Sequence, residues 1–152
     1  PEKLLHKMKK LLFTLLTFLT FQPIISISQT KCDSLGAIVS SMINNGDEGF
    51  LTDGQSYKYF LGEDETSEII TTLYEGINYR IATTAGLEDN YMIFELLDEQ
   101  RNLLFSNVNH NNAPYWNFKV ENTIECTIEA KLDPNRKLNG CAQMIIAFKK
   151  DN

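Results

Sequence analysis

Cysteine thiols and histidine imidazoles are the side chains of this chain that could support nucleophilic catalysis or hold a zinc ion. Beyond residue 28 there are three cysteines, Cys32, Cys126 and Cys141, and one histidine, His110. These four could form a Cys3His zinc site, but no Cys-x-x-Cys spacing supports one. A cysteine or serine nucleophile would need His110 as its base. Because asparagines surround His110, we interpret it as part of a flexible polar loop and assign no catalytic residue.

An exported protein normally oxidises its cysteines in pairs, so three cysteines leave one over. We take Cys126 and Cys141 as a candidate disulfide, although a hairpin centred on the turn between them would need a shifted register to bring them together. A bridge from Cys32 to either of the others, and no disulfide at all, remain the alternatives. The cysteine count therefore leaves one thiol over and does not fix the pairing.

Two acidic segments carry the hard oxygen ligands that calcium prefers. They are Glu63-Asp64-Glu65 and Glu88-Asp89-Asn90, and neither has the regular spacing of a calcium loop. We interpret both as solvated loops and expect no metal or other cofactor, with calcium as the open alternative. No pair of carboxylates is assigned to glycosidic hydrolysis, because sequence does not set their separation.

An aromatic segment follows Ala113-Pro114. Exposed aromatic rings on a sandwich edge can stack on sugars or anchor a protein partner. Strand alternation places Trp116 with Phe118 in the core and turns Tyr115 outward. The candidate ligand-binding residues are Tyr115, Trp116 and His110.

The first 28 residues have the three parts of a secretory signal. Lys9 and Lys10 precede an apolar run over 11–21, and Pro23 and the small-residue pattern Ser26-Ile27-Ser28 follow. The run is shorter than the ~20 residues that a membrane span needs. We therefore predict a signal peptide, with upstream residues, over 1–28, cleavage after Ser28, and a secreted or periplasmic protein that does not insert into the membrane.

Removal of residues 1–28 would take away four lysines and one glutamate. It would leave 10 basic and 19 acidic residues, a formal charge of −9. Such a charge repels nucleic acid and anionic lipid surfaces, so we expect neither as a partner. A cationic partner remains possible, and the oligomeric state stays open.

The elements that must position these side chains are one helix and a set of strands. Residues 29–48 predict a short helix that is capped by Asp33 or Ser34 and ends at Asn44-Asn45-Gly46. Residues 49–152 predict an antiparallel jelly-roll-like β-sandwich of about eight strands. The expected strands cover 55–61, 67–74, 77–84, 90–97, 103–107, 115–120, 123–132 and 141–149.

The last two expected strands have the clearest patterns. In 123–132, Cys126, Ile128 and Ala130 share an apolar face while charged residues alternate with them. The strand 141–149 is apolar on both faces, which favours a central position with the helix over its outer face. The turn residues Asp133-Pro134-Asn135 and Asn139-Gly140 predict a hairpin between the two.

The order of motifs over about residues 61–107 resembles the bacterial pre-peptidase C-terminal domain. In that family a gly-x-x-tyr strand leads to an asp-x-x-leu strand, an Asp/Gly turn and a short apolar strand. The matching segments are Gly76-Ile77-Asn78-Tyr79, the strand from Asp89 to Asp98, and Asn102-Leu103-Leu104. The resemblance implies a secreted, non-catalytic sandwich module, sometimes stabilised by calcium, that is attached to enzymes or works beside them.

We therefore predict an exported, non-catalytic β-sandwich that binds an extracellular or envelope partner, either a carbohydrate or a protein. The alternative is a small secreted hydrolase or inhibitor whose site lies in the 107–115 loop.

Overall fold

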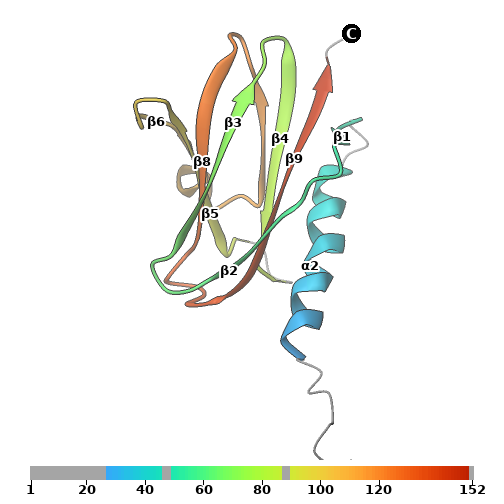
Figure 1. Ribbon diagram of the computed structural model, residues 1–152, viewed down its shortest axis with the longest axis vertical. Coiled ribbons are helices and arrows are strands. Elements are labelled where there is room, and N and C mark those ends of the chain that lie inside the picture. Colours follow the sequence, from blue (N-terminus) through green and yellow to red (C-terminus); the bar gives the residue numbers. More distant parts are fainter. Residues whose placement is uncertain (1–26, 46–48, 87–89, 151–152) are drawn as a thin grey trace, which may run out of the picture.

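The structure is a computed structural model that describes residues 27–45, 49–86 and 90–150. One α-helix, one 3-10 helix and nine strands make up this part of the chain (Figure 1). The elements are α2 (Ile27–Ile43), β1 (Leu51–Thr52), β2 (Tyr57–Leu61), β3 (Thr66–Leu73), β4 (Ile77–Thr84), β5 (Met92–Asp98), β6 (Leu103–Ser106), η1 (Asn107–His110), β7 (Tyr115–Lys119), β8 (Ile124–Leu132) and β9 (Gly140–Lys150).

The strands form two antiparallel sheets that pack face to face. Sheet A has the order β2-β9-β4-β7, and β1 also pairs with β9. Sheet B has the order β3-β8-β5-β6. Leaving aside the two-residue strand β1, the orders β2-β9-β4-β7 and β3-β8-β5-β6 have the connectivity of a jelly roll. The predicted antiparallel jelly-roll-like sandwich is therefore confirmed.

Each of the eight expected strands is present within two residues of its predicted bounds. In β8 the side chains of Cys126, Ile128 and Ala130 are buried, and those between them are partly exposed. They join Phe94, Ile81 and Met144 in the core between the sheets. The pattern did not show β1, because two residues are too few to display a period.

Helix α2 covers the outer face of sheet A. Val39 and Ile43 pack against Ile145 and Ala147 of β9 and Ala82 of β4. The predicted central position of the last strand, with the helix over it, is confirmed. The predicted cap at Asp33 or Ser34 is wrong, because the helix already begins at Ile27 and both residues lie inside it.

A buried arginine closes the C-terminal end of this helix. Arg80 of β4 is 1% exposed, and its Nη1 donates to the carbonyls of Met42, Ile43 and Asn45 at 3.0–3.1 Å. Its guanidinium also lies over the ring of Phe50, 4.4 Å from the centroid. A cation at this position satisfies carbonyls that the helix itself leaves unbonded.

The predicted hairpin between the last two strands is wrong. The turn after β8 crosses to the other sheet, so β8 lies in sheet B and β9 in sheet A. The candidate disulfide Cys126–Cys141 is wrong for the same reason. Cys141 is bonded to Cys32 of α2, with a Cα–Cα distance of 5.4 Å, while Cys126 is a free, buried thiol.

The predicted signal peptide falls almost entirely outside the described residues, which begin at Ile27. It stays a prediction, as do the domain boundaries drawn from it. Within the part of the chain that is described, no helix is both long enough and apolar enough to cross a membrane.

Candidate functional site

Five aromatic rings gather on the side of the sandwich where the edge strands β6 and β7 face each other. Phe105 lies at the centre of this aromatic cluster. Its ring centroid is 5.6 Å from Phe94, 5.4 Å from Trp116, 4.9 Å from Phe118 and 5.5 Å from His110. His110 lies 4.0 Å from Trp116. We call residues 103–119, which comprise β6, η1 and β7, the β6–β7 edge.

The loop that carries His110 is held in place by a buried asparagine. Asn107 is 0% exposed, and its Nδ2 donates to the carbonyls of Met92 and Ala113 at 3.0 and 3.1 Å. Its Oδ1 accepts a 2.9 Å hydrogen bond from the backbone N–H of Phe94. The side chain thus replaces a neighbouring strand in its hydrogen bonding. The predicted flexible loop is instead an ordered 3-10 turn.

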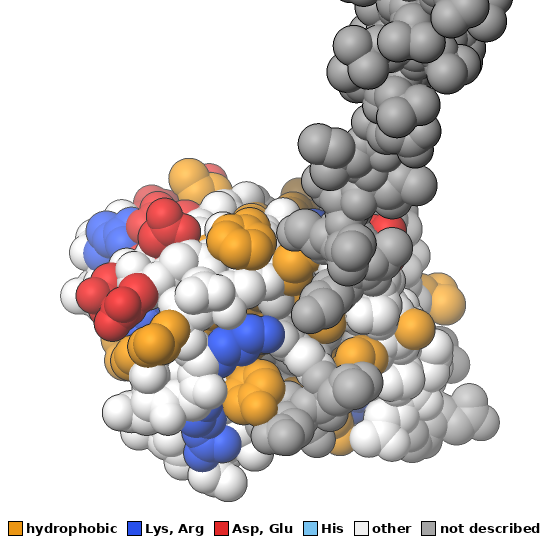
Figure 2. All heavy atoms as spheres, turned by 90° about the horizontal axis from the view of Figure 1, so that it is seen from below, with side chains coloured by type: hydrophobic (Ala, Val, Ile, Leu, Met, Phe, Trp, Pro, Cys, Tyr) orange, Lys and Arg blue, Asp and Glu red, His pale blue; other side chains and the backbone are white. Residues whose placement is uncertain are grey.

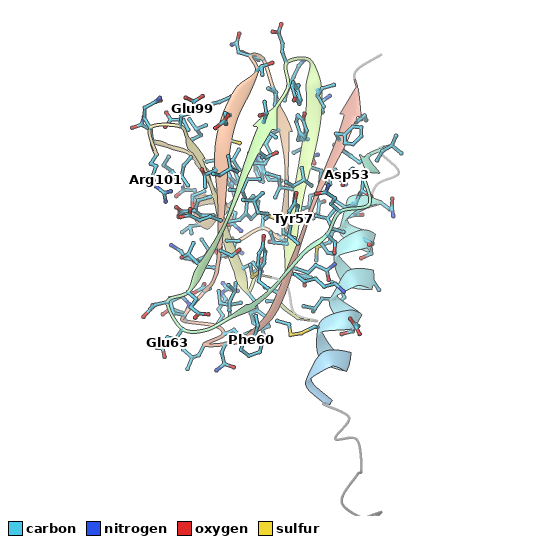
Figure 3. The ribbon with its side chains drawn as sticks, in the orientation of Figure 1. Asp53, Tyr57, Phe60, Glu63, Glu99 and Arg101 are labelled. Atoms are coloured by element: carbon cyan, nitrogen blue, oxygen red, sulfur yellow. A yellow bond between two sulfur atoms is a disulfide. The ribbon has the colours of Figure 1, made fainter. Side chains whose placement is uncertain are left out.

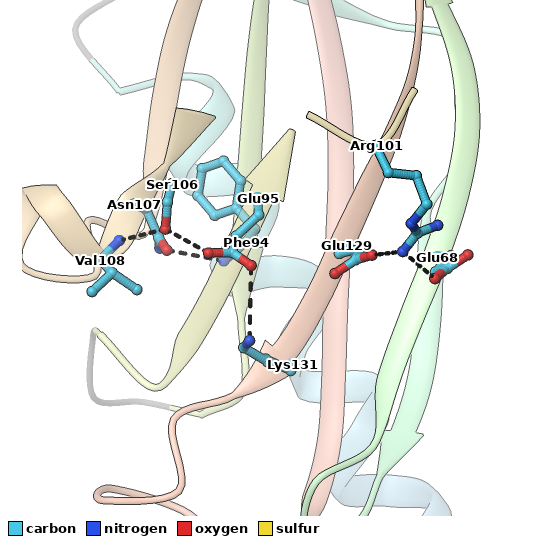
Figure 4. A network of polar contacts seen from close by, with 9 residues as sticks. All are labelled: Glu68, Phe94, Glu95, Arg101, Ser106, Asn107, Val108, Glu129 and Lys131. Atoms are coloured by element: carbon cyan, nitrogen blue, oxygen red, sulfur yellow. Dashed lines mark hydrogen bonds and ion pairs between the residues drawn. The ribbon is translucent and has the colours of Figure 1, made fainter. Parts of the chain in front are cut away.

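A second set of contacts ties the same turn to sheet B (Figure 4). The hydroxyl of Ser106 accepts from the Val108 N–H at 3.4 Å and donates to Glu95 Oε1 at 2.9 Å. The other carboxylate oxygen of Glu95 faces Lys131 Nζ at 3.8 Å. The start of the η1 turn is therefore held to β5 and β8 of sheet B through Glu95.

His110 has aromatic surroundings and not those of a catalytic base. Its exposed ring stacks on Phe105, and among the described residues it has no hydrogen bond to a serine, cysteine or carboxylate. Cys126 is buried, and desolvation raises its pKa to about 11. The thiol is thus protonated at neutral pH and is a poor nucleophile.

An apolar hollow of about 470 Å³ opens along the same edge. Leu73, Leu96, Phe105 and Phe118 are among the apolar residues that line it. The polar part of its lining includes Lys119, the last residue of β7, and Glu121 and Asn122 just after it, and Leu104 adds another apolar side chain. Leu104 and Val108 are each about half exposed, so aliphatic groups stand on the surface of the edge.

The structure brings together two of the three predicted ligand-binding residues. His110 and Trp116 are in contact, and Trp116 packs against the core as the alternation predicts. Tyr115 lies on the opposite face of β7, over the Arg80 guanidinium at 4.7 Å. Its hydroxyl accepts a hydrogen bond from Asn45. Tyr115 points away from the core as predicted, but it belongs to the helix interface and not to the His110 surface.

The acidic segments offer no metal site in the described part of the molecule. No group of three or more histidine, cysteine or acidic side chains there could hold an ion. Glu65 accepts a 2.6 Å hydrogen bond from the Gly62 N–H, which fixes the β2–β3 turn. Glu88 and Asp89 of the second segment lie outside the described residues.

The end of the sandwich that carries the β2–β3 turn has a different surface from the β6–β7 edge. Phe60 and Glu63 lie at this end, whereas Glu99 and Arg101 of the β5–β6 turn lie toward the other end (Figure 3). Viewed from the end that carries Phe60 and Glu63, exposed hydrophobic side chains form several separate groups with charged side chains between them (Figure 2). A second hollow, of about 510 Å³, is lined partly by Phe60 and Lys137. Lys137 is already engaged, because its Nζ donates to the Ala85 carbonyl.

The fold defines a class of protein: the described residues form an antiparallel jelly-roll β-sandwich with one α-helix and a disulfide. No protein-family model matches the chain, and no curated protein matches it in sequence. A solved structure that is similar in shape is PliG of Aeromonas hydrophila, a periplasmic lysozyme inhibitor of g-type lysozyme. The two share 9% sequence identity over 67% of this chain and 90% of that chain, with a TM-score of 0.47.

Sequence reasoning missed the residues that build the edge. Phe105 and Asn107 organise the aromatic cluster and the turn, yet neither was singled out as a site residue. Asparagine is a frequent loop residue, and nothing in the pattern distinguishes a buried asparagine from a solvated one. The signal that could have found them is the short apolar strand predicted at 103–107, which runs directly into the asparagine-rich segment. Phe105 and Asn107 therefore lie on the same edge of the sandwich.

Proposed function

We propose that this protein is an extracytoplasmic binding module that captures a partner protein through the β6–β7 edge. The observation that carries the proposal is the apolar hollow beside the aromatic cluster, with the aliphatic side chains of Leu104 and Val108 standing at the surface. Binding energy in protein interfaces is concentrated where a few apolar anchors enter well-packed pockets. The hollow is suited to one such anchor from the partner.

The rigidity of the edge supports this role. Asn107 and Ser106 fix the turn through hydrogen bonds to β5 and to the segment before β7. A surface that is already ordered loses less conformational entropy when a partner binds.

The surroundings of the rings favour a protein over a carbohydrate. Sugar rings stack on an aromatic face that is open to solvent, whereas His110 covers one face of Trp116 at 4.0 Å. Phe105 and Phe118 are turned inward and line the hollow. The groups left at the surface include two aliphatic side chains, which contact apolar side chains well and sugar hydroxyls poorly.

The charge of the chain favours a basic partner. After cleavage at the predicted site, 19 acidic residues face 10 basic ones. A net negative protein attracts cationic partners over long distances and accelerates their encounter, and salt screens this effect. We therefore expect the partner to be a basic protein and its association rate to fall as ionic strength rises.

The disulfide supports a location outside the cytoplasm. Cys32 and Cys141 are bonded, and such bonds persist in oxidising compartments. This agrees with the predicted signal peptide.

Site-specific photo-crosslinking tests the proposed surface. A photoreactive residue replaces Val108, and the chain is exported by its natural host and irradiated. We expect one covalent adduct, whose partner is identified by mass spectrometry, purified and shown to be basic. Leu104→Asp should weaken rebinding of that purified protein by about tenfold or more, which is the scale of a lost interface anchor.

Leu138 supplies the matched control, because it is as exposed as Val108 but lies in the β8–β9 turn. A photoreactive residue there should give no adduct, and Leu138→Asp should leave rebinding unchanged. Equal adducts from both positions would contradict the proposed surface. Binding of soluble oligosaccharides that Leu104→Asp abolishes, without any protein adduct, would contradict the choice of a protein.

A further inference from the structure

Strand β3 forms an outer edge of sheet B that has no strand beside it in the described structure. All eight of its residues pair with β8 in one unbroken register, from Thr66 opposite Lys131 to Leu73 opposite Ile124. Its other side faces away from the sheet, and no described residue bonds to the backbone of Thr66–Leu73 from that side. Such an edge presents alternate N–H and C=O groups that another strand can complete.

The devices that usually protect an edge strand are missing from β3. The strand has no proline, no lysine and no bulge, and most of its residues are β-branched. Its one charge is Glu68, and that carboxylate is already paired with Arg101 Nη2 at 3.1 Å (Figure 4). Ile70, on the same outer face, is 72% exposed. The β3 edge is thus long and regular, and few of its features would prevent another strand from pairing with it.

We propose that two copies of this chain associate through β3, with the two strands antiparallel about a two-fold axis at Ile70. Side chains directly opposite each other in an antiparallel pair share one face of the sheet. Residues on the outer face of one β3, such as Glu68 and Ile70, must therefore lie opposite residues on the outer face of the other β3. A register with Ile70 opposite Ile70 meets this condition, and a register shifted by one residue does not. The joined B sheets then form one continuous sheet of eight strands.

This register suits a second copy because of where it puts the apolar and the charged side chains. The two exposed Ile70 side chains cover each other, and Glu68 of each copy faces Thr72 of the other. The two Glu68 residues are then about 13 Å apart along the strands, given ~3.3 Å per residue. That exceeds the Debye length of ~8 Å at physiological salt, so their repulsion is screened. A register centred on residue 68 would instead oppose the two carboxylates directly.

Cysteine cross-linking tests the association and its register in the full exported chain. Residues directly opposite in an antiparallel pair have Cα atoms about 4.5–5.5 Å apart, which a disulfide can bridge. We expect Ile70→Cys to form a covalent dimer under mild oxidation. Glu68→Cys and Thr72→Cys should each remain uncross-linked alone and form a dimer when mixed. The native free thiol, Cys126, is buried and does not compete.

Sedimentation velocity provides the second measurement. We expect the wild-type mass to approach twice the monomer mass as concentration rises, and Ile70→Lys to stay monomeric, because it brings two cations together at the axis. Leu103→Cys and Leu103→Lys are the controls, since Leu103 is also exposed but lies on the far edge strand, β6. Because Ile70 is exposed, its variants should melt within a few degrees of the wild type.

A wild-type chain that stays monomeric at millimolar concentration would overturn the proposal. So would equal cross-linking of Ile70→Cys and Leu103→Cys, since that marks random collision. A dimer that cross-links through Leu103 alone would place the interface on the β6 side. The first two outcomes leave the partner surface proposed at the β6–β7 edge untouched, whereas a dimer through Leu103 would place a second copy on that edge.

Discussion

A single buried side chain, Arg80, connects the helix α2 to strands β4 and β7. Its buried guanidinium reaches the carbonyl groups at the end of α2 and also donates from Nε to Asn117 Oδ1 at 2.7 Å. The sequence identifies Arg80 only as the one charged residue of the strand Ile77–Thr84. Its role depends on the helix lying over β4, which no local pattern specifies.

Replacing Arg80 tests this role. Arg80→Met keeps the aliphatic stem and removes the donors, so helix carbonyls lose their partners in a buried place. We expect the free energy of unfolding to fall by about 3 kcal/mol, measured by urea denaturation. Arg101→Met is the matched control, because Arg101 is an exposed arginine that pairs with Glu68 and Glu129. It should cost less than about 1 kcal/mol, and equal losses would contradict the role of Arg80.

At the scale of elements, patterns that repeat within one strand were predicted well and contacts between strands were not. The alternation in β8 and the apolar run of β9 correctly showed which faces are buried. The turn residues between them correctly marked a reversal, but turn chemistry does not tell a hairpin from a crossing between sheets. That distinction decided the pairing of Cys141. The helix start was predicted too late, because the prediction relied on a capping residue at Asp33 or Ser34. Gln29, Thr30 and Lys31 are compatible with a helix, so the helix extends further toward the N-terminus.

The disulfide joins two elements, and its removal gives a prediction at this scale. Cys32 and Cys141 are 109 positions apart, and closing so long a loop stabilises a fold by about 4–5 kcal/mol in the chain-entropy model. The double variant Cys32→Ser/Cys141→Ser should therefore lose several kcal/mol in a urea titration, and reductant should lower the stability of the wild type to match.

Cys126→Ala is the control for this loss. It removes the free thiol and leaves the bridge intact, so it should change stability by less than about 2 kcal/mol, the scale of a small core truncation. Reductant should still destabilise this variant. If the double variant were as stable as the wild type, the bridge between α2 and β9 would not hold the helix on the sheet.

At the scale of the whole molecule, composition and patterning specified the fold class, while the candidate site emerged only in three dimensions. Aromatic residues from β5, β6, η1 and β7 meet at one edge because the jelly roll places β6 and β7 opposite each other. In the sequence, Phe105 and Trp116 are separated by an asparagine-rich segment that gives no sign of a cluster. The likeness to the pre-peptidase C-terminal family stays a prediction.

The exported form of the protein can be checked at this scale. Protein recovered from its natural host should begin at or near Gln29 and lie outside the cytoplasm, because the lysines, the short apolar run and the small residues before position 29 match a cleavable signal. Intact mass and N-terminal peptide mapping measure this. Recovery of the segment Leu11–Phe21 in the mature protein would favour a retained anchor.

The position of β9 determines when the molecule can finish folding. This strand comes after all the others in the described residues, yet it is the strand of sheet A with which β1, β2 and β4 all pair. A nascent chain that lacks residues 140–150 has no centre around which that sheet can close. Contacts between residues so far apart in sequence form slowly, because long loops must close first. Sheet A therefore cannot close until residues 140–150 are available to pair with β1, β2 and β4.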